Sequence, residues 1–207
     1  MKTHTIFALA LALALSACAQ TTPKNDGLVF DPNAKTQGSI TLPTGKTVNY
    51  TAYERLFYVT NVEDSTYQYM NVYVPEGATQ ETPIFLRTYV GGYMASEAAS
   101  PQAADASGRA LAEGYVVAIP GSRGRNSKVG TTWTGRAPAA ILDLKAAIRY
   151  LRHFDKEMLG NAEKIITDGT SAGGAMSALM GATGNNPEND YPQLPPLPYN
   201  LCLKEGL

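Results

Sequence analysis

The feature that most constrains the fold of this chain is a turn between two glycines, Gly169-Thr170-Ser171-Ala172-Gly173. Residues 164–167 (KIIT), just before it, form a short β-branched segment typical of a buried strand. Residues 172–182, just after it, are small and apolar on every side, which predicts a buried helix. A strand that turns sharply into a helix is typical of a parallel sheet covered by helices.

The rest of the chain predicts further strands of this sheet. Residues 48–60 and 67–74 alternate aromatic or β-branched residues with polar ones, so we expect antiparallel strands there. A shorter strand is expected at residues 40–42. Residues 83–90 and 115–119 are near-continuous apolar runs, as in strands buried on both faces. An antiparallel beginning should therefore lead into parallel strands.

Helices are expected between the parallel strands. Residues 103–113 permit a helix that stops at Gly114, and residues 137–154 predict a longer one with Pro138 in its first turn. The apolar residues of this longer helix share one face: Ala140, Ile141, Leu144, Ala147, Ile148 and Leu151. Strand and helix alternate, so the fold class is α/β, with a domain over residues 39–185.

The turn itself indicates a serine nucleophile. In a G-x-S-x-G pattern the serine lies on a strained strand-to-helix turn that holds its Oγ above the edge of the sheet. Gly169 and Gly173 lack the side chains that would clash across such a turn. The N-terminus of the following helix favours a developing oxyanion, so the Ala172 N–H is the expected first oxyanion donor to a substrate at Ser171. A purely structural glycine turn is the alternative.

A second oxyanion donor is expected after the strand at residues 83–90, where Gly91-Gly92 follows Val90 and precedes Tyr93. A plain glycine turn is again the alternative. The groups that would activate Ser171 are harder to find, because a catalytic acid and then a histidine should follow the serine in the chain. No histidine follows Ser171, and His153 belongs at a helix C-terminus on the surface. Without a base, a serine hydroxyl is a weak nucleophile.

The N-terminus predicts export. Residues 1–17 contain a short apolar run that ends in Leu-Ser-Ala before Cys18, the pattern of a lipoprotein signal peptide. We expect lipid attachment at Cys18 and display at the outer membrane or cell surface. An ordinary signal peptide is the alternative. Residues 18–38 are polar and predict a tether between lipid and domain.

The C-terminal segment, residues 186–207, is rich in proline and does not predict further parallel strands. We interpret it as the tail of a truncated or frame-shifted gene product, and a genuine short variant is the alternative. The second cysteine of the chain, Cys202, has no partner if Cys18 is lipidated, so no disulfide framework is expected.

Composition excludes other classes of function. The net charge is −1, which gives no basic surface for nucleic acid. No group of His, Cys, Asp and Glu has metal-ligand spacing, so we expect neither a metal nor another cofactor.

Several longer stretches resemble the bacterial tannase-type esterases, namely subtype B tannases and their feruloyl-esterase-like relatives. The matching stretches are VGGYM at 90–94, GYVVA at 114–118, PGSRGR at 120–125, GRAPA at 135–139, DLKAAIRYL at 143–151 and GTSAGGAMSALMGATG at 169–184. The resemblance implies an incomplete α/β-hydrolase, with the strands up to the nucleophile strand and the helix after it. In that family the acid, the histidine and a lid domain lie downstream of the stretches matched here.

The same resemblance implies a small-molecule ester as substrate, either a gallate or a hydroxycinnamate. It maps the nucleophile onto Ser171 and the oxyanion donors onto Ala172 and the Gly91-Gly92 loop. Loop residues between 122 and 135 either line the mouth of a pocket (Arg123, Arg125 and Trp133) or, for the arginines, pair with Asp143. Two other functions remain open: a non-catalytic surface lipoprotein or gene fragment, and a serine peptidase of the prolyl-oligopeptidase type.

Overall fold

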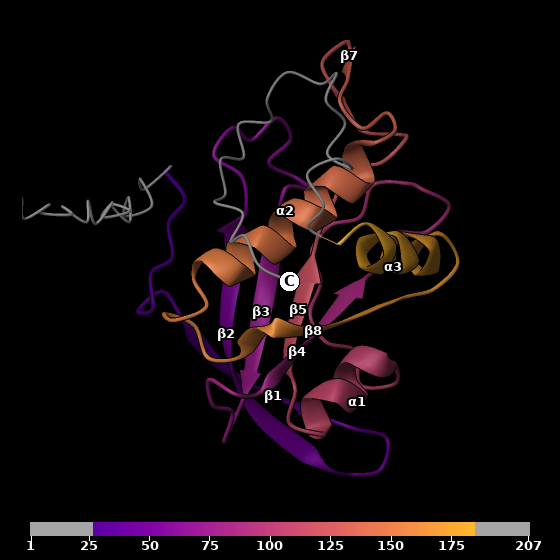
Figure 1. The fold of residues 1–207 in the computed structure, drawn as a ribbon. Coiled ribbons are helices and arrows are strands. Elements are labelled where there is room, and N and C mark those ends of the chain that lie inside the picture. The colour runs from indigo at the N-terminus through magenta and orange to yellow at the C-terminus, as the bar shows by residue number, and fades with distance from the viewer. Residues whose placement is uncertain (1–26, 185–207) are drawn as a thin grey trace, which may run out of the picture.

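A computed structural model describes residues 27–184 of the chain (Figure 1). Its elements, in chain order, are β1 (Thr36–Thr41), β2 (Thr47–Phe57), β3 (Tyr69–Pro75), β4 (Pro83–Thr88), α1 (Ala106–Ala112), β5 (Val116–Pro120), β6 (Lys128–Val129), β7 (Thr132–Trp133), α2 (Ala139–His153), β8 (Asn161–Gly169) and α3 (Ala172–Thr183). Cys18 and the tail at 186–207 lie outside the described residues.

Six strands form one mixed sheet in the order β1-β2-β3-β5-β4-β8. The strands from β1 to β5 pair antiparallel along this order, whereas β4 pairs parallel with both β5 and β8. The predicted change from antiparallel to parallel strands is confirmed. Because β4, β5 and β8 are parallel, their carboxyl ends meet at one edge of the sheet, and the loops that follow them lie close together.

Helices cover both faces of the sheet. Helices α2 and α3 pack on one face, over a core that includes Leu86, Leu144 and Tyr150, all fully buried. Helix α1 packs on the other face, where its Leu111 joins a core cluster with Val117 and neighbouring residues. Figure 1 shows α2 crossing the sheet, with α3 beside it. Strand β8 is therefore sandwiched only partly, and its Ile166 is 45% exposed.

The folded part of the chain begins earlier than predicted. Leu28 and Phe30 are buried in the main core, and the Tyr150 hydroxyl donates to the Val29 carbonyl at 2.6 Å. Strand β1 also begins before Ser39 and pairs with β2. The boundary between tether and domain at residues 38 and 39 is thus wrong. The polar residues of β1 resemble a tether because this edge strand exposes alternate side chains.

Three further expectations are corrected. Helix α2 begins at Ala139, and Pro138 is its N-cap rather than part of its first turn. The loop expected over 122–135 contains the β6–β7 hairpin. Helix α3 is not buried on all sides, because among the described elements only β8, α2 and β4 pack closely on it, and Leu179 is 42% exposed. No helix within residues 27–184 has the length and apolarity needed to cross a membrane.

Candidate active site

Ser171 lies at the turn between β8 and α3, at the edge where the parallel strands end. Its backbone has φ 56° and ψ −121°, and the residue is exposed to solvent. A non-glycine residue in such a conformation costs about 1–3 kcal/mol, and such strain is concentrated at functional sites. The strained turn presents Ser171 above the carboxyl edge of the sheet, and α3 begins immediately after it.

The flanking glycines permit this turn by close backbone contact. A Cβ added to Gly169 would lie 2.4 Å from the carbonyl carbon and oxygen of Gly173. A Cβ on Gly173 would in turn lie 3.0 Å from the carbonyl oxygen of Val90, at the end of the neighbouring strand. The glycine spacing thus reflects three backbone segments packed against one another. The contact to Val90 also brings the turn next to the segment that contains Gly91-Gly92.

The Gly91-Gly92 segment forms a tight turn after β4. The Met94 N–H donates to the Gly91 carbonyl at 2.9 Å. Gly92 and Tyr93, the two central residues, have φ of 55° and 57°, as in a type I′ turn. The structure therefore places the predicted donor loop beside Ser171, in a defined backbone conformation.

Arg123 does not line a pocket mouth, because it is buried against α2. Its Nε and Nη2 donate to the fully buried Asp143 carboxylate at 2.9 and 2.8 Å, and its backbone N–H donates to the same group at 2.8 Å. Glu63 also pairs with the guanidinium. Of the two readings of this arginine, structural pairing with Asp143 is confirmed. The pair anchors the segment after β5 to α2.

The other loop residues are exposed. Arg125 is exposed, and its Nε donates to the Gly92 carbonyl at 2.8 Å. Trp133 is 48% exposed on the β6–β7 hairpin, with the Lys128 Nζ 5.5 Å from its ring centroid. Arg125 therefore contacts the donor loop itself, whereas Trp133 packs with its own hairpin partner.

Another ion pair, which lies next to Ser171, was not predicted from the sequence. Arg87 on β4 pairs with Asp168 on β8, and its Nη2 donates to the Thr170 Oγ1 at 3.3 Å. The guanidinium also lies over the Tyr89 ring, 5.0 Å from its centroid. The available signal was an arginine inside the apolar run at 83–90, which requires a partner when half-buried.

His153 is separated from this edge by the topology. It is the last residue of α2, and its ring packs edge-on against Phe154 with centroids 4.6 Å apart. Helix α2 runs back from the carboxyl end of β5 to the beginning of β8, so its C-terminus lies near the opposite edge of the sheet from Ser171. His153 therefore has no geometric relation to the candidate site.

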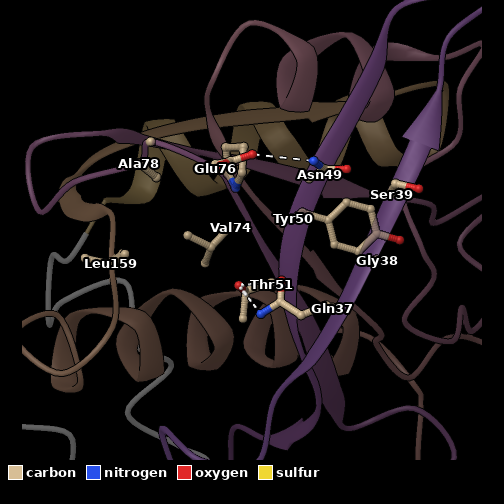
Figure 2. Close-up of a pocket in the computed structure, with 12 residues that line it drawn as sticks. Gln37, Gly38, Ser39, Asn49, Tyr50, Thr51, Val74, Glu76, Ala78 and Leu159 are labelled. Atoms are coloured by element: carbon tan, nitrogen blue, oxygen red, sulfur yellow. Dashed lines mark hydrogen bonds between the residues drawn. The ribbon is translucent and has the colours of Figure 1, made fainter.

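An open groove of about 660 Å³ also lies away from Ser171 (Figure 2). It is lined by residues of β1, β2 and the end of β3, together with Leu159 before β8. Figure 2 shows the Tyr50 ring lying over Gly38 on the neighbouring strand, a contact that covers a glycine in a sheet. The groove is a hollow in the antiparallel part of the sheet, and neither Ser171 nor the Gly91-Gly92 loop lines it.

Comparison with known proteins identifies the family. The family model BD-FAE matches residues 70–196, which include the Gly91-Gly92 turn and Ser171. The chain belongs to the BD-FAE family. No curated protein matches the sequence. The tannase of Fusobacterium nucleatum is similar in structure, with 43% identity and a TM-score of 0.73 over 77% of this chain and 36% of that protein.

Two further tannase structures support the assignment of this BD-FAE chain. A tannase from Lactobacillus plantarum is 35% identical, with a TM-score of 0.69 over 76% of this chain and 37% of that protein. A tannin acyl hydrolase in complex with ethyl gallate is 35% identical, with a TM-score of 0.71 over 77% of this chain and 38% of that protein. The resemblance to tannase-type esterases and the partial α/β-hydrolase fold are thus confirmed. The chain spans less than half the length of these tannases.

Proposed function

We propose that this chain carries the nucleophile half of a serine carboxylic-ester hydrolase that acts on phenolic esters. The observation that carries the proposal is the backbone of Ser171, strained at a strand-to-helix turn beside the Gly91-Gly92 loop. The tannase relatives support the class of reaction, and the ethyl gallate bound to one of them supports a phenolic acyl group. Gallate and hydroxycinnamate esters are the substrates to test.

In the proposed reaction the Ser171 Oγ attacks the carbonyl carbon of the ester and gives its proton to a base. The carbonyl oxygen becomes an oxyanion that accepts hydrogen bonds from the Ala172 N–H and from the Gly91-Gly92 loop. The bond between the acyl carbon and the alcohol oxygen then breaks, and the alcohol leaves with a proton. Water hydrolyses the acyl-enzyme, which releases the acid and restores the serine.

The strained turn contributes by orientation rather than by acidity. It holds Ser171 beyond the end of β8 and exposed to solvent, which places the residue where a substrate can reach it. Helix α3 is twelve residues long, and the positive end of its dipole, at the N-terminus, stabilises the oxyanion. The base and the acid are not assigned to any group within residues 27–184, where the one histidine, His153, lies at the other edge of the sheet. Turnover at Ser171 therefore requires a base from outside residues 27–184.

The test is covalent labelling by an activated aryl phosphonate, followed by peptide mass spectrometry. Ser171 should be modified, and Ser171→Ala should show no modification of the 170–184 region. Absence of labelling at Ser171 in the folded protein would contradict a nucleophile role and favour a non-catalytic lipoprotein. Comparing phenolic esters with proline-containing peptides then separates an esterase from a prolyl-oligopeptidase-like peptidase, since a peptide preference would refute the ester assignment.

We also propose that Cys18 anchors the protein to a membrane by a thioether-linked lipid. The proposal rests on the Leu-Ser-Ala-Cys order after the apolar run. Cys18→Ser should abolish incorporation of labelled fatty acid and move the protein from the membrane fraction to the soluble fraction. Unchanged lipid incorporation in Cys18→Ser would refute the anchor site, and Cys202→Ser is the matched control.

A further inference from the structure

We propose that Arg125 is a positioning residue for the oxyanion loop, an inference that rests on the proposed function of Ser171. The loop needs such support because Gly92 and Tyr93 both have positive φ, and Tyr93 is not a glycine. An L-residue in the left-handed region costs about 1–2 kcal/mol, so the turn requires contacts that favour it over extended alternatives. Arg125 supplies two of these contacts.

The first contact fixes one peptide unit. The Arg125 Nε donates to the Gly92 carbonyl at 2.8 Å. In a trans peptide the carbonyl and the next N–H point in opposite directions, so this bond also fixes the direction of the Tyr93 N–H. The Met94 N–H bond to the Gly91 carbonyl, at 2.9 Å, fixes the Gly92 N–H in the same way. The Gly92 and Tyr93 N–H groups are thus oriented through the carbonyls of the preceding residues, and the bond from Arg125 restrains the turn that carries the proposed donor at Gly92.

The second contact comes from the backbone of Arg125, whose N–H donates to the Tyr93 carbonyl at 2.8 Å. The side chain and the backbone of one residue therefore hold two successive carbonyls of the turn. Neither of these carbonyls is available to accept from a strand partner, because the turn lies beyond the end of β4. We call these two contacts of Arg125 the clamp. They take the place of the sheet hydrogen bonds that fix the backbone conformation within a strand.

Arg125 can act as a clamp because its own segment is fixed. A Cβ on Gly124 would lie 2.2 Å from the Ala95 nitrogen and from the Met94 carbonyl carbon, so the two loops touch through their backbones. The Asn126 Oδ1 accepts from the Ala95 N–H at 2.6 Å, on the other side of Arg125. Arg123, two residues earlier, is anchored to Asp143. Arg125 thus projects from a rigid segment onto a turn that carries the donors.

The guanidinium of Arg125 is exposed, so its loss should change the loop rather than the stability of the fold. The informative variant is Arg125→Met, which keeps the aliphatic stem and removes the Nε donor while the backbone N–H remains. Arg125→Lys keeps the charge without the planar donor and should behave like Arg125→Met, because the two cations are not interchangeable where geometry matters. The matched control is Arg109→Met, an exposed arginine on α1 whose guanidinium makes no hydrogen bond or ion pair to residues 27–184.

The first measurement needs no catalytic activity. Backbone ¹⁵N order parameters of Gly92 and Tyr93 should fall from about 0.85 to below about 0.6 in Arg125→Met and Arg125→Lys. Ser96 should keep its value, because it pairs with the Ser122 backbone at 3.0 and 2.8 Å independently of Arg125. Unchanged order parameters at Gly92 and Tyr93 would overturn the clamp.

The second measurement is the rate of Ser171 labelling by an aryl phosphonate. Loss of one oxyanion donor costs about 10²–10³-fold in rate, and loosening one should cost about tenfold. We expect this loss in the rate constant at saturation, with little change in the half-saturating concentration, and no change in Arg109→Met. Equal rates in the parent protein and Arg125→Met would refute the positioning role. No labelling of the parent protein would refute the proposed function instead, and the order parameters would still decide the clamp.

Discussion

Asp143→Ala should be among the most destabilising single substitutions in the described part of this protein. The carboxylate is fully buried and accepts hydrogen bonds from the backbone N–H, Nε and Nη2 of Arg123 and from the Gln68 Nε2 at 3.1 Å. Removing the carboxylate leaves the Arg123 guanidinium without its main counter-charge, although the Arg123 side chain is only 7% exposed. Glu63 remains nearby, but its side chain is 60% exposed and well solvated.

The magnitude follows from this geometry. Removing one partner of a buried ion pair costs about 3–5 kcal/mol, because the other charge stays buried and uncompensated. An exposed pair is worth about 0–1 kcal/mol, so Glu63 can compensate only a small part of the loss. A protein of this size loses about 2–4 °C in Tm per kcal/mol, which predicts a decrease of roughly 8–16 °C for a loss of about 4 kcal/mol.

Urea denaturation followed by circular dichroism measures this directly. Glu63→Gln is the matched control, since it removes the exposed carboxylate from the same guanidinium, and it should lower the free energy of unfolding by less than about 1 kcal/mol. Asp143→Leu combined with Arg123→Met should recover much of the loss, because replacing a buried pair by apolar groups is often neutral or favourable. Equal effects of Asp143→Ala and Glu63→Gln would refute the argument that burial determines the cost.

Three other predictions follow from single contacts. Gly169→Ala should lower the free energy of unfolding by about 1–3 kcal/mol, because the added Cβ would clash with Gly173. Gly181→Ala, whose added Cβ meets open space in α3, should raise it by about 0.5–1 kcal/mol in the same urea assay. Equal effects of the two substitutions would exclude the backbone clash. Burial raises the pKa of Tyr73 to about 12, so stability that is present below pH 10 should be lost as the pH rises towards 12. Tyr73→Phe should reduce this loss of stability at alkaline pH. An unchanged loss in the variant would refute the assignment of the pH dependence to Tyr73. His153→Ala should leave phosphonate labelling of Ser171 unchanged, and a large decrease would place the imidazole at the site after all.

Much of the fold could be predicted from the sequence because its signals are local. Residues 83–90 and 115–119 are apolar on both faces of their strands, and the structure buries β5 completely between β3 and β4. The edge of the sheet was harder to predict. Strand β1 is polar at most positions because it is exposed, so its pattern does not differ from that of a tether. Its pairing with β2 depends on register rather than on composition.

In the candidate site too, local features could be predicted from the sequence, whereas contacts between distant residues could not. The glycine spacing around Ser171 is a local steric requirement, so the turn could be predicted without the rest of the molecule. Arg87 and Asp168 are 81 residues apart, and Arg125 and Gly92 are 33 apart, so their contacts depend on which strands become neighbours. Neither pairing leaves a periodic pattern in the sequence. Arg123 and Asp143 are only 20 residues apart, and their pairing is one of the two alternatives that the sequence predicts for this arginine.

The contacts around Ser171 explain why half of a site can be pre-organised by itself. The turn at 169–173, the loop at 91–94 and the segment at 122–126 follow β8, β4 and β5, three neighbouring parallel strands. The segment after β4 contacts both of the others, through Val90 and Gly173 on one side and through Gly92 and Arg125 on the other. The geometry of nucleophile and oxyanion donors therefore depends on contacts within these three segments.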